Sequence, residues 1–185
     1  VDAVSTVSVF IASVPDAGGN ASVTICSSTP SFLLTDMLSG SPQPDGIWRG
    51  PDGNAVSATF SPSTAISGVY SYTVEAMPPC TDDVSLLTIS ISQASNAGLS
   101  TSISVCENSD TAIDLSTQLG GSPDADGTWS TADGAPFDGS FVPGTSAAGT
   151  YTYSVQAPAP CAAAAATVTV EVVPIPVADL IVEGA

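Results

Sequence analysis

The sequence lacks histidine and lysine altogether, and its only basic residue is Arg49. Histidine is the commonest general acid–base catalyst, and lysine is required for Schiff-base chemistry and for Lys–Asn isopeptide cross-links. A basic footprint for nucleic acid is also missing, because 18 acidic residues bring the net charge to −17. The same sign of charge disfavours anionic membrane surfaces. The composition therefore argues against nucleic-acid binding and predicts a protein that is not an enzyme.

Long apolar runs are missing as well. No stretch approaches the roughly 20 apolar residues of a transmembrane helix, so we expect no direct membrane insertion. No basic segment precedes an apolar stretch, so the sequence shows no signal peptide. We interpret the chain as a processed or excerpted piece of an exported protein.

What the sequence does contain is one pattern that occurs twice. GSPQPDGIW (Gly40–Trp48) returns as GSPDADGTW (Gly121–Trp129), and GVYSYTV (Gly68–Val74) returns as GTYTYSV (Gly149–Val155). A fixed period of about 81 residues is typical of an array of small domains. Such arrays usually provide reach and stiffness rather than chemistry.

The phase of the repeat predicts the domain boundaries. We expect repeat 1 over residues 15–93 and repeat 2 over residues 94–174. Residues 1–14 resemble the closing strand and linker of a preceding repeat, and residues 175–185 resemble the start of a further repeat or a linker. The linker between the two full repeats is short, which predicts a semi-rigid, rod-like array.

Short β-prone runs separated by Gly, Pro and Asp turns predict an all-β fold. Gly68–Ala76 alternates cleanly and places Tyr70, Tyr72 and Val74 on one face of a half-buried strand. Phe32–Leu38 is an apolar run that fits either a strand or one helical turn. Five or six short strands per repeat favour a small β-sandwich, with a closed barrel as the alternative packing.

The four cysteines fall two to a repeat. Cys26 and Cys80 are separated almost as far as Cys106 and Cys161, which predicts one disulfide within each repeat. Closing such a loop stabilises a domain by roughly 4 kcal/mol in the chain-entropy model. Disulfides indicate an oxidising compartment, so we expect an extracellular or cell-surface location. A zinc site fits poorly, because each repeat offers one cysteine pair and no histidine.

These elements together resemble the Ig-like repeats of large secreted surface adhesins of Bacteroidota, which are associated with gliding motility and type IX secretion. The resemblance rests on an opening Ala-Gly, a strand ending in cysteine, the GSPxxDGxW and GxYxYxV motifs, a Pro-Cys turn and a closing strand. It implies two tandem Ig-like β-sandwich domains that act as a stalk or filament-forming segment of an adhesin. Repeat 2 departs from repeat 1 at Cys161–Ala166, where alanines replace Thr81, Asp82 and Asp83.

The terminal strand is the sharpest functional hint. Val4–Val14 resembles Val84–Ala94, and Val7, Val9 and Ile11 share one face of this segment. A free apolar strand is an aggregation hazard, so it needs a partner. Two interpretations stay open: it caps the first domain of an excerpted array, or it is donated to the sheet of an identical subunit in a head-to-tail filament.

The aromatic residues carry the alternative function, a module that binds carbohydrate or a partner protein. An exposed Trp48 or Trp129 could stack on a sugar ring, although a core position is favoured because small domains need core volume. The paired tyrosines of each repeat are likewise expected to line the core, with their hydroxyl groups at its rim.

The remaining candidates are a calcium site and glycosylation sites. Asp124 and Asp126 begin a loop of the kind that calcium prefers, although Asp-Gly is also ordinary turn chemistry, and no other cofactor is expected. Asn20 begins an N-glycosylation sequon. Thr111 lies in an Asp-Thr-Ala sequence that resembles the O-glycosylation site of Bacteroidota.

Overall fold

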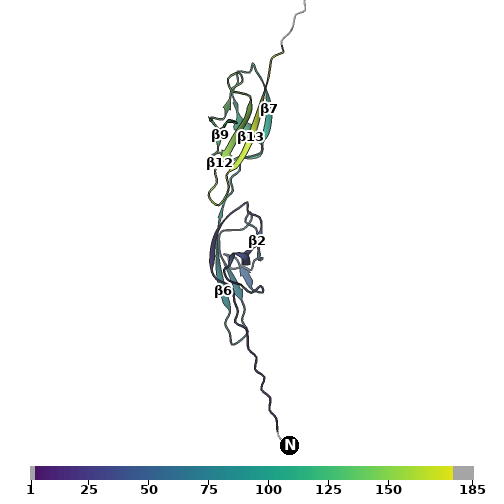
Figure 1. Ribbon diagram of the computed structural model, residues 1–185, viewed down its shortest axis with the longest axis vertical. Helices are drawn as coiled ribbons and strands as arrows, with labels where there is room; N and C mark the ends of the chain where they lie inside the picture. Colours follow the sequence, from purple (N-terminus) through teal and green to yellow (C-terminus); the bar gives the residue numbers. More distant parts are fainter. Residues whose placement is uncertain (1–2, 177–185) are drawn as a thin grey trace, which may run out of the picture. The chain divides into compact units, whose positions relative to one another are not determined.

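The computed structural model describes residues 3–176 and divides the chain into two units, Val1–Gln93 and Ala94–Ala185 (Figure 1). Both units are built from strands, with one short 3-10 helix each, so the all-β prediction is confirmed. No helix within residues 3–176 has the length and apolarity needed to cross a membrane.

The described residues of unit 1, from position 3 to 93, form six strands and one 3-10 helix. Its elements are β1 (Ala21–Cys26), β2 (Phe32–Leu33), η1 (Leu34–Met37), β3 (Ile47–Arg49), β4 (Thr59–Phe60), β5 (Gly68–Val74) and β6 (Asp83–Ser92). The sequence left open whether Phe32–Leu38 forms a strand or a helical turn. In the structure it forms a two-residue strand, β2, followed by a helical turn, η1.

Unit 2 repeats this order and adds one short strand. Its elements are β7 (Thr101–Cys106), β8 (Ile113–Asp114), η2 (Leu115–Gln118), β9 (Thr128–Ser130), β10 (Pro136–Phe137), β11 (Ser140–Phe141), β12 (Gly149–Val155) and β13 (Ala164–Val173).

Each unit is a sandwich of a large and a small sheet. In unit 1 the large sheet has the strand order β1-β6-β5-β3, and β2 pairs with β4 in the small sheet. The corresponding large sheet of unit 2 has the order β10-β9-β12-β13-β7. The closing strand, β6 or β13, lies inside the large sheet, between an antiparallel neighbour and the parallel first strand. A repeat without its closing strand would therefore lose the centre of its large sheet.

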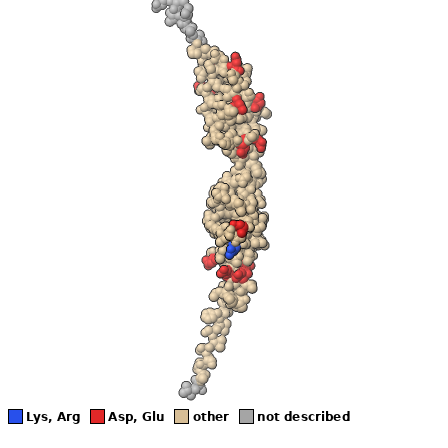
Figure 2. Space-filling model, turned by 180° about the vertical axis from the view of Figure 1, so that it is seen from behind, with Lys and Arg blue, Asp and Glu red and all other residues tan. Residues whose placement is uncertain are grey.

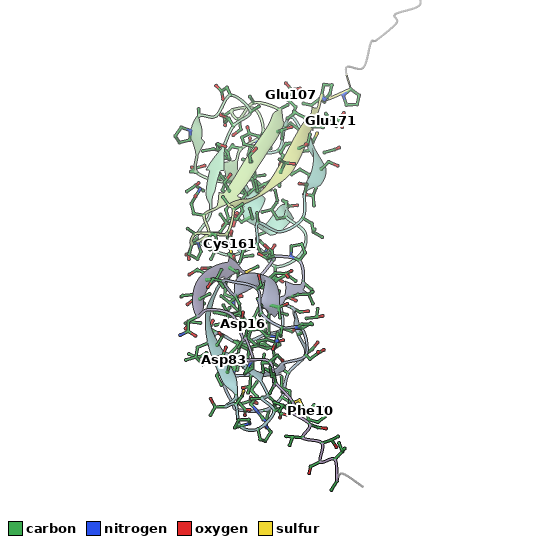
Figure 3. All side chains as sticks on the ribbon, turned by 60° about the horizontal axis from the view of Figure 1, so that its bottom comes forward. Phe10, Asp16, Asp83, Glu107, Cys161 and Glu171 are labelled. Carbon is green, nitrogen blue, oxygen red and sulfur yellow. The ribbon has the colours of Figure 1, made fainter. Side chains whose placement is uncertain are left out.

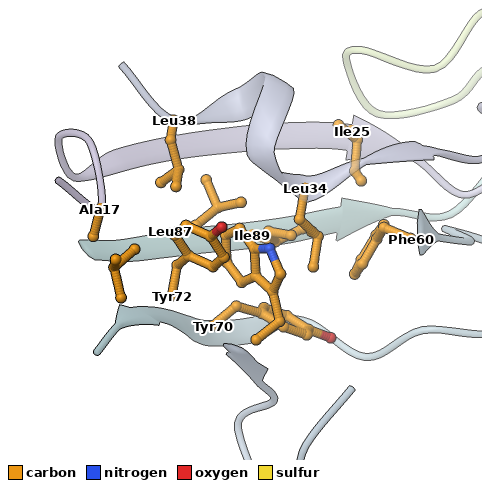
Figure 4. Close-up of a cluster of buried hydrophobic side chains, with 11 residues drawn as sticks. Ala17, Ile25, Leu34, Leu38, Phe60, Tyr70, Tyr72, Leu87 and Ile89 are labelled. Carbon is orange, nitrogen blue, oxygen red and sulfur yellow. The ribbon is translucent and has the colours of Figure 1, made fainter. Parts of the chain in front are cut away.

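The core of each unit fills the space between its two sheets. In unit 1, the side chains of Leu34, Phe60 and Leu87 are at most 4% exposed, and Figure 4 shows them converging from the helical turn and from both sheets. Unit 2 has a corresponding core around Leu115 and Phe141, both fully buried. The alternation read from the sequence is confirmed in β5, where every second residue from Tyr70 is buried.

The predicted disulfides within each repeat are wrong. Cys80 and Cys106 are free thiols, whereas Cys26 and Cys161 are each disulfide-bonded, so neither Cys26–Cys80 nor Cys106–Cys161 forms. The strand pairing explains this result. The first strand runs parallel to the closing strand, so the cysteine that ends the first strand and the cysteine that precedes the closing strand lie at opposite ends of the unit.

In unit 1, Cys26 lies opposite Ser92, the last residue of β6. Cys80 lies just before Asp83, the first residue of β6. A strand of this length spans roughly 30 Å at about 3.3 Å per residue. A disulfide needs Cα atoms within about 7 Å. The same separation holds in unit 2, where Cys161 and Glu107, the neighbour of Cys106, lie at opposite ends (Figure 3).

Candidate functional site

The two sequence motifs of each repeat meet in the structure. The hydroxyl group of Tyr72, from the GxYxYxV strand, donates to the Gln43 carbonyl and accepts from the Gly46 N–H at 2.9 Å. Both partners lie in the GSPxxDGxW motif. Unit 2 repeats the contact: Tyr153 donates to the Asp124 carbonyl at 2.6 Å and accepts from the Gly127 N–H at 2.9 Å.

These contacts explain why the motif contains a glycine. A Cβ atom on Gly46 or Gly127 would overlap the ring of Tyr72 or Tyr153. Sequence reasoning treated the Asp-Gly pair as turn chemistry and missed this role. The signal available in the sequence was that the glycine and the second tyrosine recur together in both repeats.

The first tyrosine of each motif forms a second recurring contact. Tyr70 donates its hydroxyl proton to the Ile66 carbonyl at 2.8 Å, and Tyr151 donates to the Ala147 carbonyl at 2.7 Å. Both partners lie four residues upstream, as in the tyrosine corner of Ig sandwiches. The predicted core position of the tyrosines is confirmed, since all four are at most 5% exposed.

The tryptophans belong to the cores, so the candidate sugar-stacking role is contradicted. Trp48 is 3% and Trp129 is 7% exposed, which leaves no ring face for a pyranose. Each packs against the second tyrosine of its repeat, with ring centroids 4.8 Å apart for Trp48–Tyr72 and 5.1 Å apart for Trp129–Tyr153. In antibody domains this tryptophan packs on a disulfide between the two sheets. Here a tyrosine takes that place.

The aspartates that start the candidate calcium loop have different surroundings. The carboxylate of Asp124 accepts from the Asn96 N–H at 2.8 Å, and the Asp124 N–H donates to the Asn96 carbonyl at 2.8 Å. In unit 1, Gln43 makes the matching contacts with Asp16, so an amide can replace the carboxylate. Asp126 is exposed. Within residues 3–176 no three metal-binding side chains gather, and calcium binding stays a prediction.

Other acidic side chains also accept hydrogen bonds from the protein. The carboxylate of Asp83 accepts from the Ala17 N–H at 2.7 Å, and that of Asp82 from the Ala76 N–H at 2.8 Å. Asp52 is bonded by the Asn54 side chain and N–H, which lowers the pKa of its carboxyl group. A hydrogen bond from Thr131 likewise lowers the pKa of Asp133. Each of these carboxylates is engaged in a hydrogen bond within the protein. On the face shown in Figure 2, the acidic residues lie in separate small groups.

Both candidate glycosylation residues are exposed. The Asn20 side-chain oxygen accepts from the Leu86 N–H at 2.7 Å, where it continues the contact between the opening segment and the closing strand. Thr111 lies in the loop before β8. Exposure is compatible with modification at either site, and both stay predictions.

The apolar terminal segment pairs with no strand in its described part. Residues 3–14 form no strand, and Val7, Val9 and Ile11 are between 80% and 94% exposed. Phe10 projects away from the chain in Figure 3 and is 94% exposed. The predicted C-terminal repeat start, over residues 175–185, lies almost entirely outside the described residues.

The buried tyrosines predict a loss of stability in alkali. Burial raises the pKa of Tyr70 and of Tyr151 above the ordinary value of 10.0. The folded state thus holds these protons more tightly than the unfolded state. Their contribution to the free energy of unfolding is therefore fully present below pH 10, and it is lost as the pH rises through the raised pKa values of the folded state. Urea unfolding between pH 9 and 11 should show this fall, and no lysine titrates in that interval.

The matched control is the double variant Tyr70→Phe and Tyr151→Phe. It should be less stable at pH 8, because two hydrogen bonds are lost, and should show a shallower alkaline slope. An unfolding free energy of the parent protein that is constant from pH 9 to 11 would contradict the prediction.

Comparison with known proteins identifies the fold. No family model matches the sequence, and no curated protein matches it. Among solved structures, the chain is similar to the insect immune protein hemolin, with 13% identity, 86% of this chain and 46% of that chain covered, and a TM-score of 0.52. An I-band fragment of titin, I67–I69, matches with 10% identity, 84% and 63% coverage and a TM-score of 0.46.

The N-terminal four Ig domains of Dscam1 match with 14% identity, 87% and 45% coverage and a TM-score of 0.41. The chain thus spans less than two thirds of each of these structures. At this level of identity the comparison concerns the fold alone. Together with the sheet order and the tyrosine corner, the match to hemolin confirms two tandem Ig-like β-sandwiches.

Proposed function

We propose that this chain is a non-catalytic extracellular structural segment, a stalk or filament-forming part of a cell-surface adhesin of the kind that Bacteroidota secrete. The observation that carries the proposal is that the side chains able to bind a ligand or catalyse a reaction are instead engaged in the fold. The tryptophans and tyrosines pack in the two cores, and the carboxylates of Asp82, Asp83 and Asp124 accept backbone N–H groups. Tandem Ig domains also occur in hemolin, whose structure was described with implications for homophilic adhesion.

Electron microscopy of the native material, combined with a glycan array, tests this proposal. We expect beaded chains or regular filaments, and no tight binding to any glycan. Tight binding to a sugar, abolished by a substitution that leaves both units folded, would replace the structural role with the binding-module alternative.

We further propose that residues 4–12 are the closing strand of another repeat. Under the sequence match of Val4 with Val84, Val7 and Val9 correspond to Leu87 and Ile89 of β6, which are at most 1% exposed. Unit 2 has Val168 and Val170 at these positions, at most 2% exposed. In the described residues both units hold their own closing strands. The terminal strand would thus enter a further repeat of the same longer chain, or replace the closing strand of a repeat in another copy.

A paired substitution tests the terminal strand. Changing Val7→Asp and Val9→Asp should abolish end-to-end assembly of the purified chain, because two charges would enter the core of the accepting repeat. The control Ser8→Asp places a charge on the opposite face and should leave assembly unchanged. Light scattering and negative-stain images measure the outcome. Equal loss with both variants would mean that charge alone, and not strand insertion, controls assembly.

A further inference from the structure

We propose that Cys106 of one copy and Cys80 of another form a disulfide that joins repeats end to end. This inference deepens the proposed structural function, on which it rests, by naming the partner and the chemistry of one joint. It does not depend on insertion of the terminal strand.

Each unit carries one cysteine at each end of its closing strand. Cys26 and Cys106 end the first strands, opposite Ser92 and Val173. Cys80 and Cys161 lie in the turn before the closing strand. About 30 Å of strand separates the two ends, which excludes a bond within one unit.

The cysteines at corresponding places have similar hydrogen-bond contacts, although Cys26 is buried and Cys106 is exposed. The Cys80 N–H donates to the Met77 carbonyl at 3.0 Å, and the Cys161 N–H donates to the Pro158 carbonyl at 3.0 Å. The first-strand cysteines each contact a polar side chain two residues on: Cys26 lies 3.1 Å from the Ser28 hydroxyl oxygen, and Cys106 lies 2.9 Å from the Asn108 side-chain oxygen.

Their oxidation states complete the argument. One first-strand cysteine, Cys26, and one turn cysteine, Cys161, are disulfide-bonded. Their counterparts Cys106 and Cys80 are free, the first exposed and the second half-buried. The chain thus has one free first-strand thiol and one free turn thiol, each at a position where the equivalent cysteine of the other repeat is disulfide-bonded. A second copy of the chain supplies the complementary thiol for each.

The reaction is balanced by thiol–disulfide exchange with a small disulfide such as oxidised glutathione. The thiolate of Cys106 attacks the glutathione disulfide, releases one glutathione thiol and forms a mixed disulfide. The thiolate of Cys80 from another copy then attacks the protein sulfur and releases the second glutathione. Two protein thiols are oxidised, and one small disulfide is reduced to two thiols.

The test uses the full chain in a glutathione redox buffer, analysed by non-reducing electrophoresis and peptide mass spectrometry. We expect a ladder of dimers and higher multimers, with Cys106–Cys80 as the new cross-link. The variants Cys80→Ser and Cys106→Ser should each stay largely monomeric. Mixed together, they should form dimers several-fold more abundantly than either alone.

Three results would overturn the proposal: no multimers, dimers formed by each variant alone as readily as by the mixture, or thiol loss confined to the monomer. Far-UV circular dichroism verifies that both serine variants are folded. Filaments that assemble from the double serine variant would show that the proposed structural function does not require this disulfide.

Discussion

Replacing Trp48 by alanine should lower the free energy of unfolding of unit 1 by about 3–5 kcal/mol, a large part of the stability of a small domain. The side chain is 3% exposed and packs on Tyr72, so its removal leaves a cavity between the sheets. The Trp48 Nε1 atom has no hydrogen-bond partner among the described residues, so the loss is one of packing.

Urea unfolding of this variant gives a separate signal for each unit. Trp129 is then the only tryptophan, and its fluorescence follows unit 2. We expect circular dichroism to show two transitions, of which only the later one coincides with the fluorescence change. Trp129→Ala is the mirror-image control, with Trp48 as the reporter and unit 2 unfolding first. A Trp129 transition that shifts with the Trp48→Ala change would show that the cores are not independent.

The second large effect is expected from a single methyl group. Gly127→Ala should destabilise unit 2 by about 2–3 kcal/mol, because the new Cβ overlaps the Tyr153 ring and the overpacked turn must move. The shift would also strain the hydrogen bonds that Tyr153 makes with the Gly127 N–H and the Asp124 carbonyl. Thermal unfolding, followed by near-ultraviolet circular dichroism of the aromatic residues, measures this effect.

Asp126→Ala is the matched control on the same turn. Asp126 is exposed, so the change should alter stability by no more than about 0.5 kcal/mol. Gly46→Ala should reproduce the effect of Gly127→Ala in unit 1, where a Cβ would overlap Tyr72. If Gly127→Ala proves as mild as Asp126→Ala, the close approach of turn and ring is not what requires the glycine.

The sequence by itself determined the repeat, the strands and the members of the core. Its period aligned Tyr70 with Tyr151 and Trp48 with Trp129, and its alternation placed the tyrosines on the buried face of their strand. These features are local or periodic. A side chain's face follows from its position along a strand, and small domains have few large residues with which to fill a core.

Only the tertiary structure decided which motifs meet and which cysteines can bond. Similar spacing suggested Cys26–Cys80, but separation along the chain carries no information about direction across a sheet. The parallel pairing of β1 with β6 puts Cys26 and Cys80 at opposite ends of the unit. The contact between Gly127 and Tyr153 likewise joins residues 26 positions apart and depends on the antiparallel pairing of β9 with β12. Strand order and direction are properties of the whole sheet, and they set these distances.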